Sequence, residues 1–522
     1  MRRAHLTPAL VVLVLLSGCS RCGAPRAAPP PERFVPAASS GALVIPVIAE
    51  AARQAAALHG ALAARPGGEA LGQVRAGLRQ QLTFDVFDPE SLRGAGLDVQ
   101  RGLAVAELTI RPGEPGAPLL VLPVGDAARL EAQVTRLAQE RLGAGDRGQQ
   151  AASGLAFTVW RRAAGEPALL SVAQVEGSML LAIGPTGPDV LRAVLALDPA
   201  VSLAESPSWK RARAALGDGF PLLFFAPRDA PALLDLPATD GVAAGLSATA
   251  SGLRLALAAM LGAQEPRVRP LAGPGEGSSQ PSRLDPATVV ALRLSADPAV
   301  ALRLVSEQRG QALIEPVAAM AAQLATPVEV GVGLAPRADL NALVGGRALA
   351  QPLRVARLEA LAGLKDPAAF TAACDQLMAL LGAPAGHGTW TMGGGDAEVA
   401  WAVQGRAVAL SAGVAGGLPP LRARLQAGGR GFEPPAGTAG ALAGGLGGLV
   451  LHGDNLVAAL RALPPSAFGA GPDAVVGRSL ADQVIGSLGQ GAALALRADL
   501  PAGALKLTLD LKLGTPAAAP PH

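Results

Sequence analysis

The 522-residue sequence contains no tyrosine, and aromatic residues make up only 3% of it. Lysine is almost as scarce, because all but Lys210, Lys365, Lys506 and Lys512 of the 44 basic residues are arginines. The accompanying excess of Ala, Arg, Gly and Pro is typical of a GC-rich genome. Acidic residues number 41, so charge is nearly balanced and no basic stripe of the kind that binds a phosphate backbone stands out. A nucleic-acid partner is therefore not expected.

Cysteine is too rare for a disulfide framework, since the chain has only Cys19, Cys22 and Cys374. Cys19 and Cys22 form a C-x-x-C pattern, which in other contexts indicates a redox pair or half of a zinc site. No second pair completes tetrahedral ligation. Cys374 lies on an apolar helical stripe and is interpreted as a small buried hydrophobe.

The motifs of common enzyme classes are also missing. No glycine precedes a lysine, which excludes a Walker-type phosphate loop, and neither H-E-x-x-H nor G-x-S-x-G occurs. In the part expected to be ordered, the histidines are His59, His387 and His452. These leave little for a general base or a metal site. We therefore expect no catalytic residue, no cofactor and no metal.

The N-terminus, in contrast, carries a strong pattern. Arg2 and Arg3 precede the apolar run Ala9–Leu16, which is too short to span a membrane and is typical of a secretory leader. Leu16-Ser17-Gly18-Cys19 follows and resembles the lipobox of bacterial lipoproteins. The resemblance implies cleavage between Gly18 and Cys19 and lipidation of the Cys19 thiol. It implies a cell-envelope location, at the outer membrane if the cell has two membranes, because Ser20 rather than Asp follows Cys19.

The rest of the chain shows an internal repeat. PLLVLPV, Asp126, a stripe beginning at Leu130 and Val134, and a strand pair turning at Glu176-Gly177 make up the first copy. About 230–240 residues later come RLEALAGLK, Asp366, a stripe beginning at Phe370 and Cys374, and a strand pair turning at Gln404-Gly405. A repeat of this length indicates a duplicated module. Gly177 is expected to correspond to Gly405, and Asp126 to Asp366.

The repeat and the Pro-rich stretches divide the chain into six parts. The expected parts are a signal peptide (1–18), a Pro-rich tether (19–37), module copy 1 (38–262), a linker (263–283), module copy 2 (284–513) and a disordered tail (514–522). Each copy is expected to be an α+β module of antiparallel sheet with packed helices, with one sheet face buried and the other wet.

A second resemblance covers most of the first copy and, more faintly, the second. FDPESLRGAGLDVQRGLAVAEL (Phe87–Leu108), PVGDAARLEAQV and SLAESPSWKRARAAL resemble a family of bacterial envelope proteins known only as a domain of unknown function. The quoted segments are packing and turn patterns. The resemblance implies an extracytoplasmic α+β domain and supplies neither an activity nor site residues.

Polar clusters offer the remaining candidates for a site. His452-Gly453-Asp454-Asn455 is compatible with an acid/base pair or a cation site, but a strand end followed by an Asp N-cap is favoured, with Asp229 in the same role in the first copy. Asp85, Asp88 and Asp98 are compatible with a hydrolase or with Ca²⁺, but capping and turns are favoured. A similar preference holds for the remaining patterns: turns at Gly393–Gly395 and Gly444–Gly448, and core packing for Trp160 and Trp390.

Three functional hypotheses remain open. The favoured one is a membrane-anchored envelope lipoprotein with a non-catalytic binding, scaffold or assembly role, whose partners are the membrane, through the lipid on Cys19, and an envelope protein. The alternative is a carrier of an apolar ligand such as a lipid, held between sheet and Ala-rich helices. A hydrolase-type enzyme is the least favoured, because no catalytic motif supports it.

Overall fold

The computed structural model describes 19 stretches of the chain. They are residues 28–65, 68–110, 116–227, 240–262, 265–272, 282–309, 314–335, 355–380, 382, 389–392, 397–413, 417–427, 431–443, 445–468, 475–479, 481–482, 485, 489–501 and 503–515. The predicted signal peptide 1–18, the predicted lipidation site Cys19 and the cleavage position at Gly18 lie outside these residues, as do Cys22, Asp229 and His387. Among the residues described, no helix is both long and apolar enough to cross a membrane.

The chain forms two compact units. The first comprises residues 1–264 with 501–506, and the second comprises residues 265–500 with 507–522. Each contains an antiparallel sheet with packed helices, which confirms the α+β class expected from the sequence.

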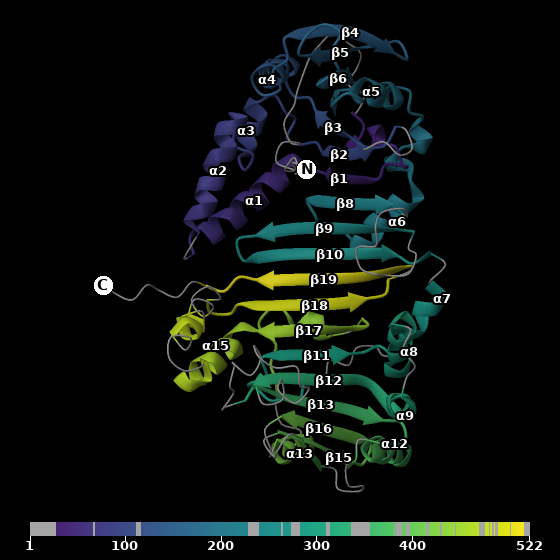
Figure 1. Cartoon of the computed structure of the whole chain (residues 1–522), viewed down its shortest axis with the longest axis vertical. Coiled ribbons are helices and arrows are strands. Elements are labelled where there is room, and N and C mark those ends of the chain that lie inside the picture. The colour runs from purple at the N-terminus through teal and green to yellow at the C-terminus, as the bar shows by residue number, and fades with distance from the viewer. Residues whose placement is uncertain are drawn as a thin grey trace, which may run out of the picture. The chain divides into compact units, whose positions relative to one another are not determined.

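The first unit is built on a ten-stranded antiparallel arrangement (Figure 1). The pairings give the strand order β10-β9-β8-β1-β2-β3-β7-β6-β5-β4. The strands are β1 (Gly41–Ile45), β2 (Leu103–Leu108), β3 (Ala117–Pro123), β4 (Asp146–Ala152), β5 (Leu155–Arg161), β6 (Leu170–Val175), β7 (Ser178–Ile183), β8 (Leu222–Pro227), β9 (Gly241–Thr249) and β10 (Gly252–Met260). The α-helices are α1 (Ile48–Ala63), α2 (Glu69–Leu82), α3 (Pro89–Gly94), α4 (Ala127–Glu140), α5 (Gly187–Leu195) and α6 (Pro207–Leu216).

Both faces of this sheet are covered at its centre, where a wet second face was expected. On β3, Leu119 and Val121 face one core with residues of α5 and α6, whereas Leu120 and Leu122 face another with residues of α1, α3 and α4. Figure 1 shows these two groups of helices on opposite sides of the strands. The unbroken apolar run of β3 is the reason, because alternate side chains of a strand need an apolar partner on both faces.

Asp88-Pro89 and Asp126 begin helices as the sequence predicts. The Asp88 carboxylate accepts hydrogen bonds from the N–H groups of Glu90 and Ser91, and Asp126 accepts one from the N–H of Arg129. These bonds satisfy donors that have no partner within the helix. On α4 the buried stripe is Leu130, Val134 and Ala138.

The second unit has an antiparallel sheet with the order β18-β17-β11-β12-β13-β16-β15-β14, and β19 lies beside β18 (Figure 1). Its strands are β11 (Val290–Leu294), β12 (Leu324–Leu334), β13 (Ala356–Leu364), β14 (Thr389–Met392), β15 (Ala397–Gln404), β16 (Ala407–Gly413), β17 (Gly447–His452), β18 (Ala493–Asp499) and β19 (Ala504–Lys512). The α-helices with printed bounds are α7 (Glu265–Val268), α8 (Pro298–Arg309), α9 (Glu315–Gln323), α12 (Pro367–Leu380), α13 (Leu418–Ala427), α14 (Ala439–Leu442) and α15 (Gly453–Ala462).

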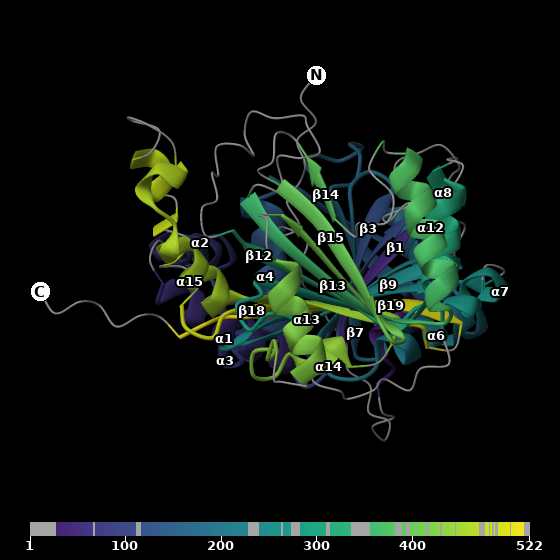
Figure 2. The same cartoon turned by 90° about the horizontal axis from the view of Figure 1, so that it is seen from below.

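Helices cover both faces of this sheet too. Leu421 of α13 and Leu442 of α14 pack in one core with Leu361 of β13, and Phe370 and Cys374 of α12 pack in another. Figure 2 shows α13 and α14 on one side of the strands and α8 and α12 on the other. Again the wet second face expected from the sequence is not found at the centre.

Three predicted segment boundaries differ from the structure. The predicted tether 19–37 contains the 3₁₀-helix η2 (Pro31–Phe34), and Phe34 and Val35 are buried in the first unit's core because both are apolar. The predicted linker 263–283 contains α7 and the 3₁₀-helix η6 (Arg269–Leu271). The predicted tail 514–522 begins with an ordered residue, since Thr515 pairs with Gln490 through backbone hydrogen bonds.

Two strand elements were not anticipated. The hairpin of β4 and β5 extends the first sheet, and β12 joins β11 to β13 in the second. The polar, alternating sequence of β4, DRGQQAA, carries little apolar signal because every second side chain is exposed. β12 follows α9 without an intervening loop, which hides the change of periodicity.

Candidate functional site

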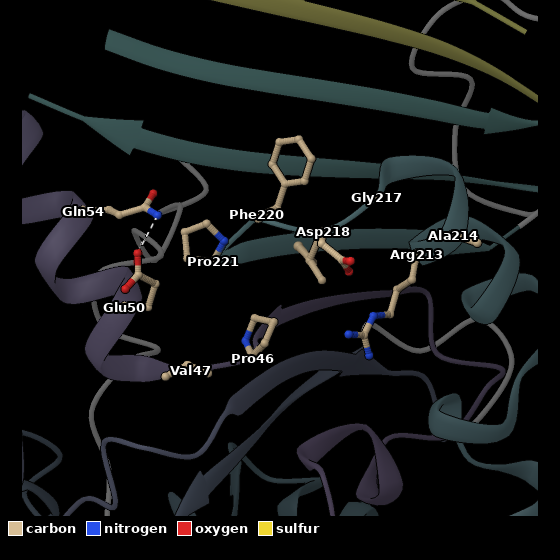
Figure 3. A pocket seen from close by; sticks show the side chains of 12 residues that line it. Pro46, Val47, Glu50, Gln54, Arg213, Ala214, Gly217, Asp218, Phe220 and Pro221 are labelled. Carbon is tan, nitrogen blue, oxygen red and sulfur yellow. Dashed lines mark hydrogen bonds between the residues drawn. The ribbon is translucent and has the colours of Figure 1, made fainter. Parts of the chain in front are cut away.

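The candidate site is a cavity of about 580 Å³ in the first unit (Figure 3). It lies between the start of α1 and the segment that joins α6 to β8. Its lining consists of Pro46, Val47, Glu50, Gln54, Arg213, Ala214, Gly217, Asp218, Gly219, Phe220, Pro221 and Leu223. The volume falls within the range of about 300–1,000 Å³ that is common for small-molecule sites.

The joining segment owes its course to two glycines and one aromatic ring. Gly217 ends α6 with φ of 82°, and Gly219 follows with φ of 92°, conformations that favour glycine. The ring of Phe220 then packs on β9, because a Cβ at Gly245 would lie only 2.6 Å from the Phe220 Cγ. Together these residues turn the chain over the cavity and give it an apolar wall.

One side of the cavity is anionic and firmly held. Gln54 donates through Nε2 to Glu50 Oε1 at 2.9 Å and accepts through Oε1 from the N–H of Ala248 at 2.8 Å. Arg53 also donates to Glu50, at 2.8 Å. These bonds from Arg53 and Gln54 lower the pKa of Glu50. Figure 3 shows Glu50 and Gln54 on α1, at the side opposite Arg213.

The other side carries Arg213 of α6. Its guanidinium lies over the ring of Trp209, 5.9 Å from the centroid, and 3.7 Å from a carboxylate oxygen of Glu32. Glu32 belongs to η2, and its side chain is only 6% exposed. Burial raises the pKa of Glu32, although its backbone hydrogen bond and Arg213 act in the opposite direction.

The cavity thus combines an apolar wall with separated charges. Phe220, Pro221 and Leu223 form the wall, and acidic and basic groups lie at opposite sides. Such a lining suits a small amphiphile better than a purely apolar chain. Sequence reasoning missed this site because its residues come from two helices and a loop that share no motif.

The sequence candidates at His452 serve as structural contacts. The Nδ1 atom of His452, and not Asp454, caps α15 by accepting from the N–H of Asn455 at 3.4 Å. Asp454 instead accepts from the N–H of Gly491, and Asn455 donates to the carbonyls of Pro286 and Thr288. The predicted Asp N-cap at 454 is therefore wrong, because the helix starts one residue earlier, at Gly453.

The predicted carboxylate group is likewise taken up by local structure. Asp85 accepts from Arg75 and from the N–H of Phe87, Asp88 caps α3, and Asp98 accepts from the N–H of Gln100. Burial raises the pKa of Asp85, but the Arg75 and Phe87 hydrogen bonds outweigh it and the net pKa is lowered. Within the described parts of the chain, no three His, Cys, Asp or Glu side chains are grouped so that they could hold a metal ion.

The other sequence candidates mostly lie in the core. Cys374 is buried, and burial, with Asp375 nearby, raises the pKa of its thiol to about 11. Trp160 is 5% exposed, with Arg147 over its ring. Gly447 and Gly448 open β17 instead of forming the expected turn. Gly393–Gly395, Gly444 and the side chain of Trp390 lie outside the described residues.

Comparisons with known proteins give little. No family model matches the chain, and no curated protein matches it. Among solved structures, crystal forms IV, I and III of TP0453 align with 9%, 12% and 10% identity, covering 48%, 45% and 45% of this chain and 89%, 80% and 81% of TP0453. The TM-score is 0.24 in each case, which is too low to assign a fold or a function.

Proposed function

We propose that this protein is a lipid-anchored protein of the cell envelope that acts by non-catalytic binding through two α+β modules. The observation that carries the anchor is the sequence Leu16-Ser17-Gly18-Cys19 behind an apolar run of leader length. A single acyl chain binds membranes only marginally, so stable anchoring requires several chains on the one cysteine.

The proposal of a duplicated module is supported by the strand order of each unit. Reading outward from β1, the first unit runs β8-β9-β10 in one direction and β2-β3-β7-β6-β5 in the other. Reading outward from β11, the second runs β17-β18 and β12-β13-β16-β15-β14. The same topology reached twice along one chain favours repetition of one ancestral unit.

Strand register supports it further. Pro123 pairs with Ser178 on the first unit's hairpin, and Gly363 pairs with Ala407 on the second's. From these positions Asp126 and Asp366 each follow three residues later, and both cap a helix. The proposed equivalence of Asp126 with Asp366 therefore agrees with the pairing.

The equivalence of Gly177 with Gly405 does not agree with it. The first hairpin loop is Glu176-Gly177, between Val175 and Ser178, whereas the second is residues 405–406, between Gln404 and Ala407. Gly177 therefore corresponds in position to Arg406. Glu176 and Gly177 both have positive φ, while in the second loop Gly405 has it at the first position. Different turn types account for the one-residue offset.

Replacement of the lipid-accepting thiol tests the anchor. In Cys19→Ser we expect an uncleaved or mislocalised precursor, because no other atom at that position takes the lipid. Mass spectrometry of the N-terminal peptide and fractionation of membranes give the readout, with Cys22→Ser as the matched control. An unmodified, soluble mature N-terminus in the wild type would contradict the proposal.

A second candidate function, transport of an apolar or amphiphilic ligand, is favoured by the cavity of the first unit. Its volume of about 580 Å³ and its wall of Phe220, Pro221 and Leu223 leave room for such a molecule. Solvent extraction of the purified chain, followed by mass spectrometry, tests this role. Recovery of a ligand from wild type but not from Leu223→Trp, which fills the space, supports a carrier; no ligand from either opposes it.

A further inference from the structure

The second unit places charged residues where the first has apolar core. Strand pairing relates Val44 on β1 to Arg293 on β11, and Ala104 on β2 to Glu329 on β12, through the registers that join β3 to β7 and β13 to β16. Val44 and Ala104 are fully buried. Arg293 is also buried, and its side chain is 8% exposed.

The same relationship holds on the next strand. Leu119 on β3, which is fully buried, corresponds to Glu359 on β13, whose side chain is 3% exposed. The first unit shows that this topology packs with apolar residues at all three positions. Buried ion pairs are often no more stabilising than apolar residues of similar volume. Packing alone therefore gives no reason for the charges.

Part of the charge cluster neutralises itself. Arg424 of α13 donates to Glu359 at 2.5 Å and lies 3.4 Å from Asp285. Arg357 lies 2.7 Å from Asp285 and 3.8 Å from Glu359. Two guanidinium groups thus match two carboxylates, and none of the four residues lines the neighbouring cavity.

The rest of the cluster faces a cavity of about 270 Å³. Its lining consists of Arg283, Arg293, Thr326, Pro327, Glu329, Leu361, Ala362, Gly363, Ala407 and Leu425. Glu329 is engaged by its own neighbours, because it accepts from the Ser282 hydroxyl and the N–H of Arg283 and lies 3.9 Å from Arg293. Two cationic side chains and one carboxylate leave a net positive charge in the lining.

We propose that this cavity binds a small monocarboxylate with a short apolar body. The guanidinium groups of Arg283 and Arg293 match the geometry and charge of a carboxylate. The walls formed by Pro327, Leu361 and Leu425 take the apolar part. The volume, below that of a drug-sized pocket, limits the ligand to a few carbon atoms beyond the carboxylate.

Calorimetric titration of the full chain in a non-ionic detergent tests the site. Hexanoate is expected to bind once per chain with a Kd below about 1 mM. Hexylamine, of equal length and opposite charge, is expected to give no saturable heat, and so is inorganic phosphate, which lacks the apolar body. Binding of hexylamine as tightly as hexanoate, or of phosphate in place of hexanoate, would overturn the assignment.

Two variants locate the site. Arg283→Gln changes an exposed residue and should weaken hexanoate at least about tenfold. The double variant Arg293→Val, Glu329→Ala copies the residues of the first unit and should abolish binding while the chain still folds. Arg422→Gln, an exposed change on α13 away from the cavity, is the matched control. Unchanged affinity in Arg283→Gln would place the ligand elsewhere and overturn the proposal, whether or not the double variant folds.

Discussion

The Glu32 carboxylate lies 3.7 Å from the Arg213 guanidinium, and its side chain is only 6% exposed. This contact joins η2, close behind the N-terminal 27 residues outside the described structure, to the helix that lines the candidate cavity. The ion pair does not fully compensate the carboxylate for the loss of water, because burial raises the pKa of Glu32.

Glu32→Gln should therefore stabilise the protein at neutral pH. A raised pKa in the folded state means that this group's contribution is present below the unfolded value of about 4.5 and is lost as pH rises through the folded value. The neutral amide removes that loss, so the gain should be large at pH 7 and vanish near pH 4. Urea unfolding at both pH values measures it, with Glu205→Gln, an exposed partner of Lys210, as control. A variant less stable than wild type at pH 7 would contradict this account.

The His452 cap should give an opposite dependence on pH. Burial lowers the pKa of His452 from 6.5, and Asp454 only partly opposes this. A lowered pKa means that stability is present above the unfolded value and is lost as pH falls through the folded value. Protonated Nδ1 cannot accept from Asn455, so the cap is lost as well. We expect His452→Asn, which retains a capping acceptor, to lose less stability than wild type between pH 7.5 and 5. Equal losses in thermal melts would argue against the cap.

Removal of Arg424 should be costly. Its partner Glu359 is 3% exposed, so Arg424→Ala leaves a buried carboxylate without its shortest ion pair. We expect a loss of about 3–5 kcal/mol in the free energy of unfolding. Arg53→Ala removes a pair with Glu50 in which both side chains are exposed and should cost about 0–1 kcal/mol. Similar costs in urea titrations of the two variants would show that the cluster is hydrated.

The first hairpin loop stores local strain that one substitution should relieve. Glu176 has φ of 49°, a left-handed conformation that asparagine adopts more readily. Glu176→Asn should raise stability by about 0.5–1 kcal/mol. Gly177→Ala should do the reverse, because its φ is 71° and a Cβ would lie 3.3 Å from Arg101 Nη1. Thermal melts compare the two, and a destabilised Glu176→Asn would refute the argument.

Local structure could be predicted from residues that act locally. Asp88-Pro89 indicated a helix start, and Glu176-Gly177 indicated a hairpin; both are found. The spacing of Leu130 and Val134 predicted the buried side of α4. Each depends on backbone hydrogen bonds or turn geometry within a few residues, so the tertiary structure adds little to them.

The candidate sites could not be predicted in this way. Arg293, Glu329 and Glu359 lie on three strands and form one cluster only because β11, β12 and β13 are neighbours. His452 displaced Asp454 as the cap because the helix began one residue earlier than its sequence pattern suggested. The sequence by itself determined the leader pattern, the α+β class and most helix starts, which depend on nearby residues. Tertiary structure alone decided which faces are covered and which charges meet, because long-range strand pairing brings together residues that share no local pattern.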